Sequence, residues 1–300
     1  MYNEIASNKR KTWLLITIFS ILIIFLFLAL GIVMEIDPIL SLIFGTAFAI
    51  GYSLISFYIG DKVTLLSQGA KPIEKRDAFE LYTIVENLSI TAGIPTPKIY
   101  VIDDPAPNAF ATGRDPNHAT VAVTTGLLQI LNKQELQGVI AHEISHIKNY
   151  DIRIMTVVVI LIGVIIITSD ILRRTMFFKS GDSKKGGNIM LAIFLVGLVL
   201  GILSPFIAEA IKLAISRTRE YLADASGVLL TRYPDGLASA LEKISNSGTK
   251  MKKASHATAH LYISDPYGKK ITPTTPWYKK MFLTHPPTHD RIAKLRNMGI

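Results

Sequence analysis

The sequence predicts an α+β membrane protein with two to four transmembrane helices, a predominantly helical core and a small antiparallel sheet. Three observations support this fold class. Almost half of the 300 residues are apolar (49%) and only 18% are charged, whereas soluble domains carry about a quarter charged residues. The apolar residues form long uncharged runs, which membrane segments require. Between these runs, segments of helical periodicity alternate with short β-rich segments.

The first two apolar runs predict a transmembrane hairpin over residues 1–60. Trp13–Met34 carries no charge and, at about 1.5 Å per residue, is long enough to cross a hydrocarbon core of about 30 Å. Ile39–Ile59 follows after the short link 35–38. Lysine and arginine flank the hairpin on its outer sides and are absent from the link. Because these residues accumulate on the cytoplasmic side of a membrane, both outer flanks are expected to face the cytoplasm.

Two later apolar runs, within residues 152–211, allow more than one interpretation. Ile154–Leu172 includes one aspartate, and Ile189–Ala208 is interrupted by glycine and proline. The loop between them is basic, so it would lie outside, against the positive-inside rule, if both runs cross the membrane. Four spans are favoured, and re-entrant or protein-packed helices are the alternative.

Two regions, 61–151 and 212–300, are expected to lie outside the membrane and to carry the chemistry. In the first, Asp77–Ala92 has helical spacing of apolar residues and is followed by a Gly-Ile-Pro stop. Three segments then have strand character: Lys98–Ile102, Pro107–Gly113 and Thr120–Leu128. They predict the small antiparallel sheet.

A capped helix carries the main candidate site. Asn132 and Glu135 have the spacing of a capping box, which predicts a helix from this point to about Lys148. His142 and His146 lie on this helix, four residues apart. Residues at this spacing share one helix face, so both imidazoles can reach a single metal ion.

The residue after the first histidine completes a His-Glu-x-x-His motif. Glu143 can reach a water molecule on the open side of the metal, take its proton and later pass that proton to a leaving amine. Zinc would polarise a peptide carbonyl in such a site. The alternative is a pair of exposed histidines on an amphipathic helix. The surrounding apolar residues predict a buried helix instead, where unpaired histidines are costly; these residues are Ile140, Ala141, Ile144 and Ile147.

A catalytic zinc needs a third protein ligand, and the chain has no cysteine, so this ligand must be histidine or a carboxylate. Glu220 and Asp224 share one face of a predicted helix. Glu220 could bind the metal while Asp224 hydrogen-bonds a ligand imidazole. On spacing alone, a solvated helix in which these carboxylates pair with Arg217 and Arg219 deserves equal weight. The His285-Pro-Pro-Thr segment, taken alone, indicates only the start of a helix.

These motifs together resemble the HtpX branch of integral membrane zinc metallopeptidases, which are bacterial relatives of the CAAX prenyl endopeptidases. The likeness covers nearly the whole chain, including the hairpin and the two later apolar runs. The motifs stand in the order of the family: Asn108–Gly113, Ala141–His146 followed by Asn149 and Asp151, Arg219–Asp224, and His285–Thr288 with Arg291. Several separated motifs in this order are more specific than His-Glu-x-x-His alone.

The resemblance implies a zincin-like metalloprotease core with one Zn²⁺ per subunit. The implied metal ligands are His142, His146 and Glu220. Glu143 is implied as the general base, and Asp224 as a residue that orients a ligand. His285 would help to stabilise the tetrahedral oxyanion, and Arg291 would support the site.

The resemblance also implies a substrate-binding edge strand. Its residues are Asn108, Ala109, Phe110, Ala111 and Thr112. An extended substrate backbone could pair with this strand by strand addition. Because this mode of binding reads main chain more than side chains, broad specificity is expected.

The resulting hypothesis is a multi-pass zinc endopeptidase of the bacterial plasma membrane. It would cleave misfolded or surplus membrane proteins at the cytoplasmic face, in quality control and the stress response; this role rests on the resemblance alone. Expected partners are polypeptide substrates and the lipid bilayer. Nucleic acid is not expected, because the 32 basic residues are spread through the chain. The alternatives are a prenyl-protein-type processing peptidase, a non-catalytic membrane scaffold and a transporter.

Overall fold

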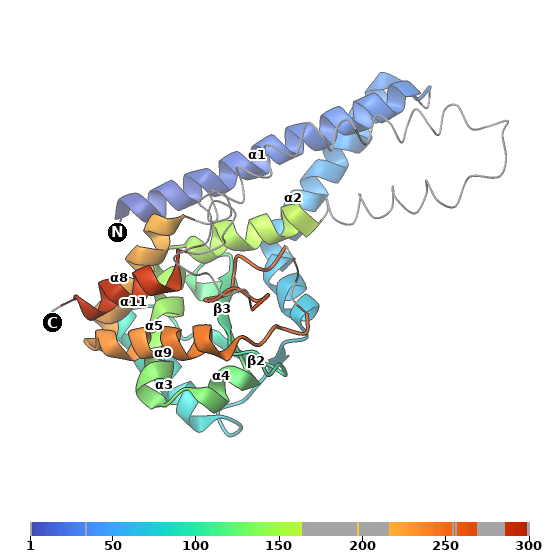
Figure 1. Cartoon of the computed structure of the whole chain (residues 1–300). Helices are drawn as coiled ribbons and strands as arrows, with labels where there is room; N and C mark the ends of the chain where they lie inside the picture. Colours follow the sequence, from blue (N-terminus) through green and yellow to red (C-terminus); the bar gives the residue numbers. More distant parts are fainter. Residues whose placement is uncertain are drawn as a thin grey trace.

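The computed structural model describes residues 2–33, 35–163, 197, 216–253, 255, 257–268 and 286–298. Within these ranges the chain is mostly helical, with one four-stranded sheet in the globular part of the molecule (Figure 1). Two long helices extend from this globular part. The predicted fold class is confirmed.

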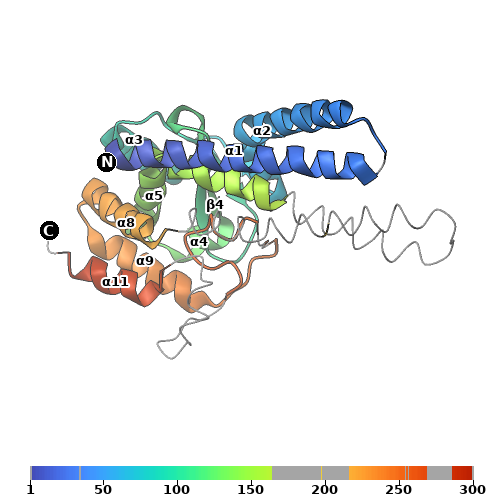
Figure 2. The same ribbon diagram turned by 90° about the horizontal axis from the view of Figure 1, so that it is seen from above.

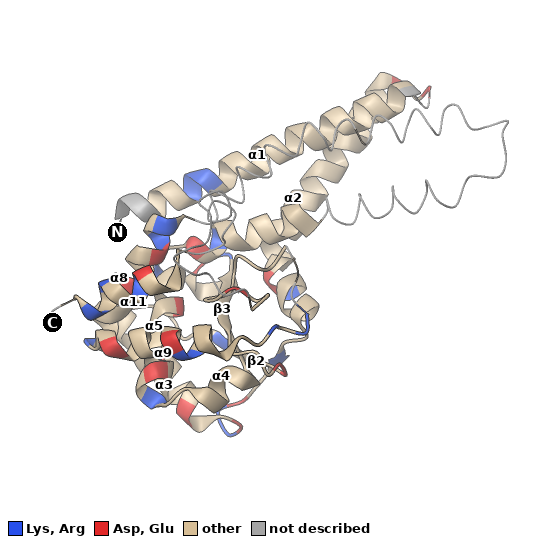
Figure 3. Ribbon diagram, in the orientation of Figure 1, with Lys and Arg blue, Asp and Glu red and all other residues tan. Residues whose placement is uncertain are grey.

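The two long helices form the predicted hairpin. α1 (Tyr2–Val33) and α2 (Pro38–Gln68) lie side by side (Figure 2), and both are long and apolar enough to cross a membrane. Asp37 caps α2 by accepting hydrogen bonds from the backbone N–H groups of Ile39 and Leu40. Figure 3 shows Lys and Arg near the start of α1 and on the globular part, with most of the hairpin uncharged.

The globular part contains a sheet in the order β1-β2-β4-β3. The strands are β1 (Lys71–Pro72), β2 (Lys98–Ile102), β3 (Ala109–Gly113) and β4 (Ala119–Thr124). β1 and β3 are antiparallel to their neighbours, but β2 and β4 are parallel. The sheet is therefore mixed, and the prediction of an antiparallel sheet is wrong in this respect. The reason is the strand order. β3 forms the edge of the sheet, and β4 lies between β3 and β2. Because β4 runs antiparallel to β3, it runs parallel to β2.

Helices surround this sheet. α3 (Phe79–Ala92) ends at Gly93, whose φ of 71° suits a glycine cap. The expected strand Thr120–Leu128 stops at Thr124, because the Thr124 side chain caps α4 (Thr125–Ile130). The helices that follow are α5 (Lys133–Lys148), α8 (Arg217–Thr231), α9 (Pro234–Ser247) and α11 (Thr288–Arg296), and a short 3₁₀ turn, η1 (Pro116–His118), precedes β4.

The regions 61–151 and 212–300 share one hydrophobic core, so the predicted catalytic regions fold together. This core contains Val85 of α3, Val121 of β4, Ile140 of α5 and Leu237 of α9, each at most 1% exposed. The two regions meet mainly where α5 packs on α8 and α9. Burial of a large aliphatic side chain contributes about 1.5–3 kcal/mol, so this shared core fixes the relative positions of the two regions.

A second core joins the hairpin to the globular part. It contains Ile16 of α1, Leu65 of α2, Phe110 of β3 and Val158. Val158 belongs to a helix over residues 151–163, which includes the start of the predicted run Ile154–Leu172. The remainder of that run lies outside the described residues, as does Ile189–Ala208 apart from Gly197.

Candidate metal centre

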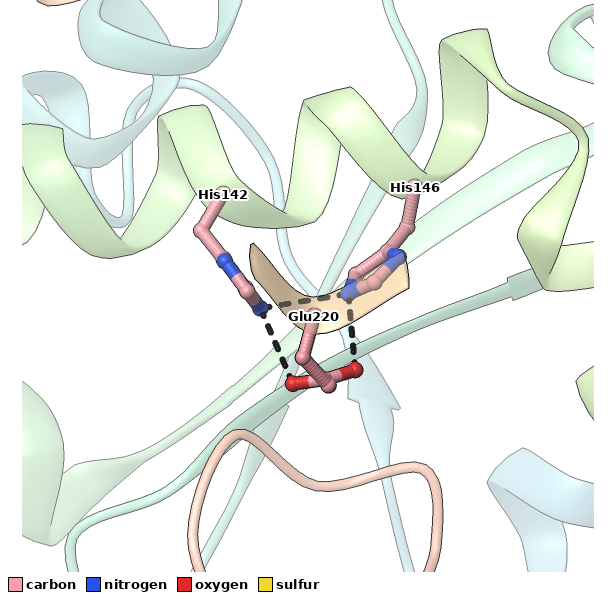
Figure 4. A group of neighbouring side chains, drawn as sticks. All are labelled: His142, His146 and Glu220. Atoms are coloured by element: carbon pink, nitrogen blue, oxygen red, sulfur yellow. Dashed lines mark hydrogen bonds and ion pairs between the residues drawn. The ribbon is translucent and has the colours of Figure 1, made fainter. Parts of the chain in front are cut away.

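α5 and α8 bring three potential metal ligands together. His142 and His146 project from one face of α5, and Glu220 of α8 points between them (Figure 4). The two Nε2 atoms are 3.1 Å apart. Glu220 places Oε2 3.8 Å from Nε2 of His142 and Oε1 3.5 Å from Nε2 of His146. All three residues are buried.

The other ring nitrogen of each histidine faces a carboxylate. Nδ1 of His142 lies 2.9 Å from Asp224, and Nδ1 of His146 lies 2.9 Å from Asp151. When each Nδ1–H donates to its carboxylate, each Nε2 presents a lone pair toward Glu220. Carboxylate–histidine pairs of this kind orient the imidazoles of metal sites.

This donor set fits a metal cation. Bonds of about 2.0–2.2 Å in a tetrahedral arrangement separate ligand atoms by roughly 3.3–3.6 Å, which lies within the 3.1–3.8 Å observed between the three donors. Two lone pairs and one carboxylate also attract positive charge. Burial opposes a charged His146, but the hydrogen bond to Asp151 and the charge of Glu220 raise its pKa to about 9, so a proton competes with a metal cation for its Nε2 and metal binding would release that proton. Burial lowers the pKa of His142, which favours the neutral, metal-binding form.

A glycine permits the close approach of the two helices that carry these ligands. A Cβ atom at Gly227 of α8 would lie 3.1 Å from the backbone nitrogen of His142. Glycine therefore lets α8 contact the backbone of α5 directly, two turns along α8 from Glu220. This contact helps to set the distance between Glu220 and the histidines.

Glu143 lies beside the ligands and is 2% exposed. Burial raises its pKa to about 7, although the charges of His146 and Arg291 and the backbone N–H of Ala111 act in the opposite direction. A carboxyl group with a pKa near neutrality can both take up and release a proton under physiological conditions. Its interaction with Ala111 also places it against β3.

Arg291 of α11 also lies beside the ligands, 3.4 Å from Nδ1 of His142 and 3.7 Å from Oε2 of Glu220. Its guanidinium is 1% exposed and donates to both oxygens of Asp224, from Nε at 2.9 Å and from Nη2 at 2.6 Å. Nη1 donates to the Ile263 carbonyl at 3.2 Å. Burial alone would raise the pKa of Asp224, but Arg291 and His142 lower it to about 2. The structure thus places Asp224 and Arg291 beside His142.

The predicted substrate-binding segment is an edge strand, and its side chains are buried. The Ala109 carbonyl accepts a hydrogen bond from Ile263 N–H at 3.0 Å. The Asn108 side chain pairs with the backbone of Ser264, donating to its carbonyl at 3.0 Å and accepting from its N–H at 3.2 Å. The neighbouring Phe110 packs edge-on against Tyr262. One part of this edge is therefore lined by the chain's own residues 262–264.

The remaining residue of this segment, Thr112, contacts the helix over residues 151–163. Its hydroxyl lies 2.8 Å from that of Thr156.

Of the expected site residues, His285 lies outside the described residues. Sequence reasoning gave no role to Asp151, which contacts His146. The available signal was its position five residues after His146, in the segment that follows the His-Glu-x-x-His helix.

Comparison with known proteins agrees with this geometry. The model of Peptidase family M48 matches residues 75–299. The "Protease HtpX homolog" of Caldanaerobacter subterraneus subsp. tengcongensis is 46% identical, covering 100% of this chain and 98% of the relative. The protein of the same description from Dictyoglomus thermophilum is also 46% identical, with coverages of 99% and 95%.

The fold is also found in a solved structure. The crystal structure of S. mikatae Ste24p matches with a TM-score of 0.53 and 21% identity, over 98% of this chain and 67% of that protein. The apolar hairpin and the relatives that match over the full chain support a membrane protein, and the family match makes it a metalloprotease. On these grounds, the chain belongs to Peptidase family M48.

Proposed function

We propose that this metalloprotease is a zinc endopeptidase that cleaves misfolded or surplus membrane proteins at the cytoplasmic face of the bacterial plasma membrane. The observation that carries the proposal is the buried cluster of His142, His146 and Glu220 beside the Glu143 carboxylate. Two imidazoles and one carboxylate form a common donor set of catalytic zinc and leave a position open for water or substrate. This set fits zinc in both chemistry and spacing.

In the proposed mechanism His142, His146 and Glu220 hold the ion. A zinc ion held there would supply Lewis-acid chemistry, which would polarise the scissile carbonyl and lower the pKa of the attacking water. The Glu143 carboxylate accepts a proton from that water as the water oxygen attacks the carbonyl carbon. Glu143 then delivers the proton to the amine nitrogen as the C–N bond breaks. Burial raises the pKa of Glu143 to about 7 in the metal-free protein, and a bound cation would favour the carboxylate form that accepts the proton.

Residues around the ligands have positioning roles in this proposal. Asp224 orients His142 through Nδ1, and Arg291 holds Asp224 in place. The resemblance to the family assigns oxyanion stabilisation to His285, and this assignment stays a prediction.

The proposed binding mode for substrates is strand addition to β3. β3 is the outer strand of its sheet, and the N–H of Ala111 faces Glu143. Ile263 already pairs its N–H with the Ala109 carbonyl, which is the type of backbone contact that an extended substrate would make. Unfolded or damaged segments offer such a backbone, and this property supports a role in quality control.

The proposed topology rests on charge. Lys9, Arg10 and Lys11 precede the apolar part of α1, and the globular part lies at the same end of the hairpin (Figure 3). Positive flanks favour the cytoplasmic side, so the metal centre is expected to work there. A hairpin anchor would also keep the centre close to membrane-protein substrates.

Casein hydrolysis tests the proposed activity. The detergent-purified full chain is incubated with unfolded casein, with zinc or with a chelator, and the products are identified by mass spectrometry. Internal cuts at many sites, abolished by the chelator, are expected. Cleavage of a prenylated peptide without cleavage of casein would favour the processing peptidase. If zinc-loaded protein cuts neither substrate, the proposed activity is wrong.

A further inference from the structure

A residue of the membrane hairpin reaches the support of the metal centre. Asn8 lies near the start of α1, before the apolar run, and is fully buried. Its Nδ2 donates to the Asn149 carbonyl at 3.0 Å and to Oδ1 of Asp151 at 2.6 Å. Asn149 caps the end of α5 and Asp151 is the first residue of the helix over residues 151–163, so both lie far from Asn8 in the sequence.

The same Asp151 carboxylate supports a candidate ligand with its other oxygen. Oδ2 of Asp151 lies 2.9 Å from Nδ1 of His146, while Oδ1 receives the Asn8 amide. Arg219 of α8 is farther away, with Nη1 3.8 Å from Oδ1. One oxygen of the Asp151 carboxylate contacts Asn8 and the other contacts His146, so hydrogen bonds on both sides fix the orientation of the carboxylate.

The turn at residues 149–150, directly before Asp151, has an uncommon backbone conformation. Tyr150 has a φ of 59°, a region that non-glycine residues rarely adopt and that surrounding contacts must stabilise. α1 supplies such contacts: Asn8 binds the Asn149 carbonyl, and the Lys9 ammonium lies 4.4 Å from the centre of the Tyr150 ring. The start of α1 is therefore packed onto this turn at several points.

We propose that Asn8 is a positioning residue for the metal centre, acting through Asp151 on His146. The inference rests on the proposed function, because it takes His146 as a metal ligand. In this view α1 is part of the metal-binding structure as well as a membrane anchor. Loss of the Asn8 amide removes a donor from a buried carboxylate and leaves the His146 ring less firmly oriented.

The test measures zinc affinity in the full chain in detergent, by competition with a chromogenic chelator. Asn8→Leu keeps the approximate size of the side chain and removes its hydrogen bonds. Direct partners of ligand residues are typically worth about 10–100-fold in metal affinity; Asn8 acts through such a partner, so a loss toward the lower end of this range, about 10-fold, is expected. The visible spectrum of the Co²⁺-substituted protein, which reports ligand geometry, is expected to change as well.

Thr12→Val is the matched control. Thr12 is one turn further along α1 and equally buried, and its hydroxyl donates to the Asn8 carbonyl of its own helix at 2.9 Å. Its removal perturbs the same helix without touching Asp151. Near-native zinc affinity and an unchanged Co²⁺ spectrum are expected, with a melting temperature close to that of Asn8→Leu.

An exchange variant covers the case in which Asn8→Leu does not fold. Asn8→Asp alone places two carboxylates in contact and is expected to weaken zinc binding. The double variant Asn8→Asp/Asp151→Asn restores a donor–acceptor pair between the two positions and is expected to recover part of the affinity. Affinity in the double variant no better than in Asn8→Asp would contradict the proposal.

The outcomes separate this inference from the proposed function. His146→Ala, measured in parallel, shows whether His146 holds zinc. If His146→Ala loses zinc while Asn8→Leu binds it like the unmodified chain, the role of Asn8 is wrong and the proposed function stands. If the unmodified chain binds no zinc, both are wrong.

Discussion

Arg291 and Asp224 form a buried bidentate pair, with Nε and Nη2 of the arginine at 2.9 and 2.6 Å from the two carboxylate oxygens. The same carboxylate lies 2.9 Å from Nδ1 of His142. The pair therefore joins α11, α8 and α5 at the candidate metal centre. Loss of either partner would leave the other buried charge with weaker compensation, because Glu220 lies 3.7 Å from Nη1 of Arg291 and His142 is the other partner of Asp224.

Arg291→Met is expected to destabilise the fold and weaken zinc binding together. Breaking one side of a buried ion pair costs about 3–5 kcal/mol, and the free Asp224 orients His142 less well. The measurements are the melting temperature and the zinc affinity. Arg296→Met, in an exposed pair with Glu242, is the control and is expected to change both by little. Equal effects of the two substitutions would contradict the role of Arg291.

Glu220→Gln is expected to lower zinc affinity strongly while preserving the fold. The amide has the size of the carboxylate but lacks the negative charge that faces both Nε2 atoms. Zinc content after dialysis, together with the melting temperature of the metal-free protein, tests this expectation. Glu86→Gln, which alters an exposed pair with Lys75, serves as the control. Full zinc occupancy in Glu220→Gln would show that the Glu220 carboxylate is not the third metal ligand.

Gly227→Ala is expected to reduce zinc affinity without removing any polar group. The added methyl group would lie 3.1 Å from the His142 nitrogen, so α8 must move away from α5 by a few tenths of an ångström and carry Glu220 with it. Overpacking of this type costs about 1–3 kcal/mol. Gly51→Ala is the control, because a Cβ atom there meets nothing within 4 Å. Unchanged affinity in Gly227→Ala would show that the helix spacing tolerates this shift.

The sequence was most informative where the chemistry is local. The capping box of Asn132 and Glu135 is formed as expected, and the spacing of His142 and His146 required only one regular helix. The Glu220 side chain could not be placed by spacing, because its approach depends on how α8 packs against α5. The position of β4 was missed for a similar reason: strand order depends on which segment takes the edge of the sheet.

The contact between Asn8 and Asp151 was the least accessible to sequence reasoning. It joins residues separated by 143 positions and depends on the left-handed conformation of Tyr150. Asn8 belongs to no spacing pattern that indicates a partner. Such a contact follows only from the packing of the hairpin on the globular part.

The most direct test of the central claim compares Glu143→Gln with the unmodified chain for zinc content and casein hydrolysis in one preparation. Glu143 contributes a proton-accepting carboxylate but no ligand atom to the cluster of His142, His146 and Glu220. The variant is therefore expected to retain one zinc per chain and to lose about 10²–10⁴-fold in turnover. Normal turnover in the zinc-loaded variant would contradict the assignment of Glu143 as the base and, with it, the proposed mechanism.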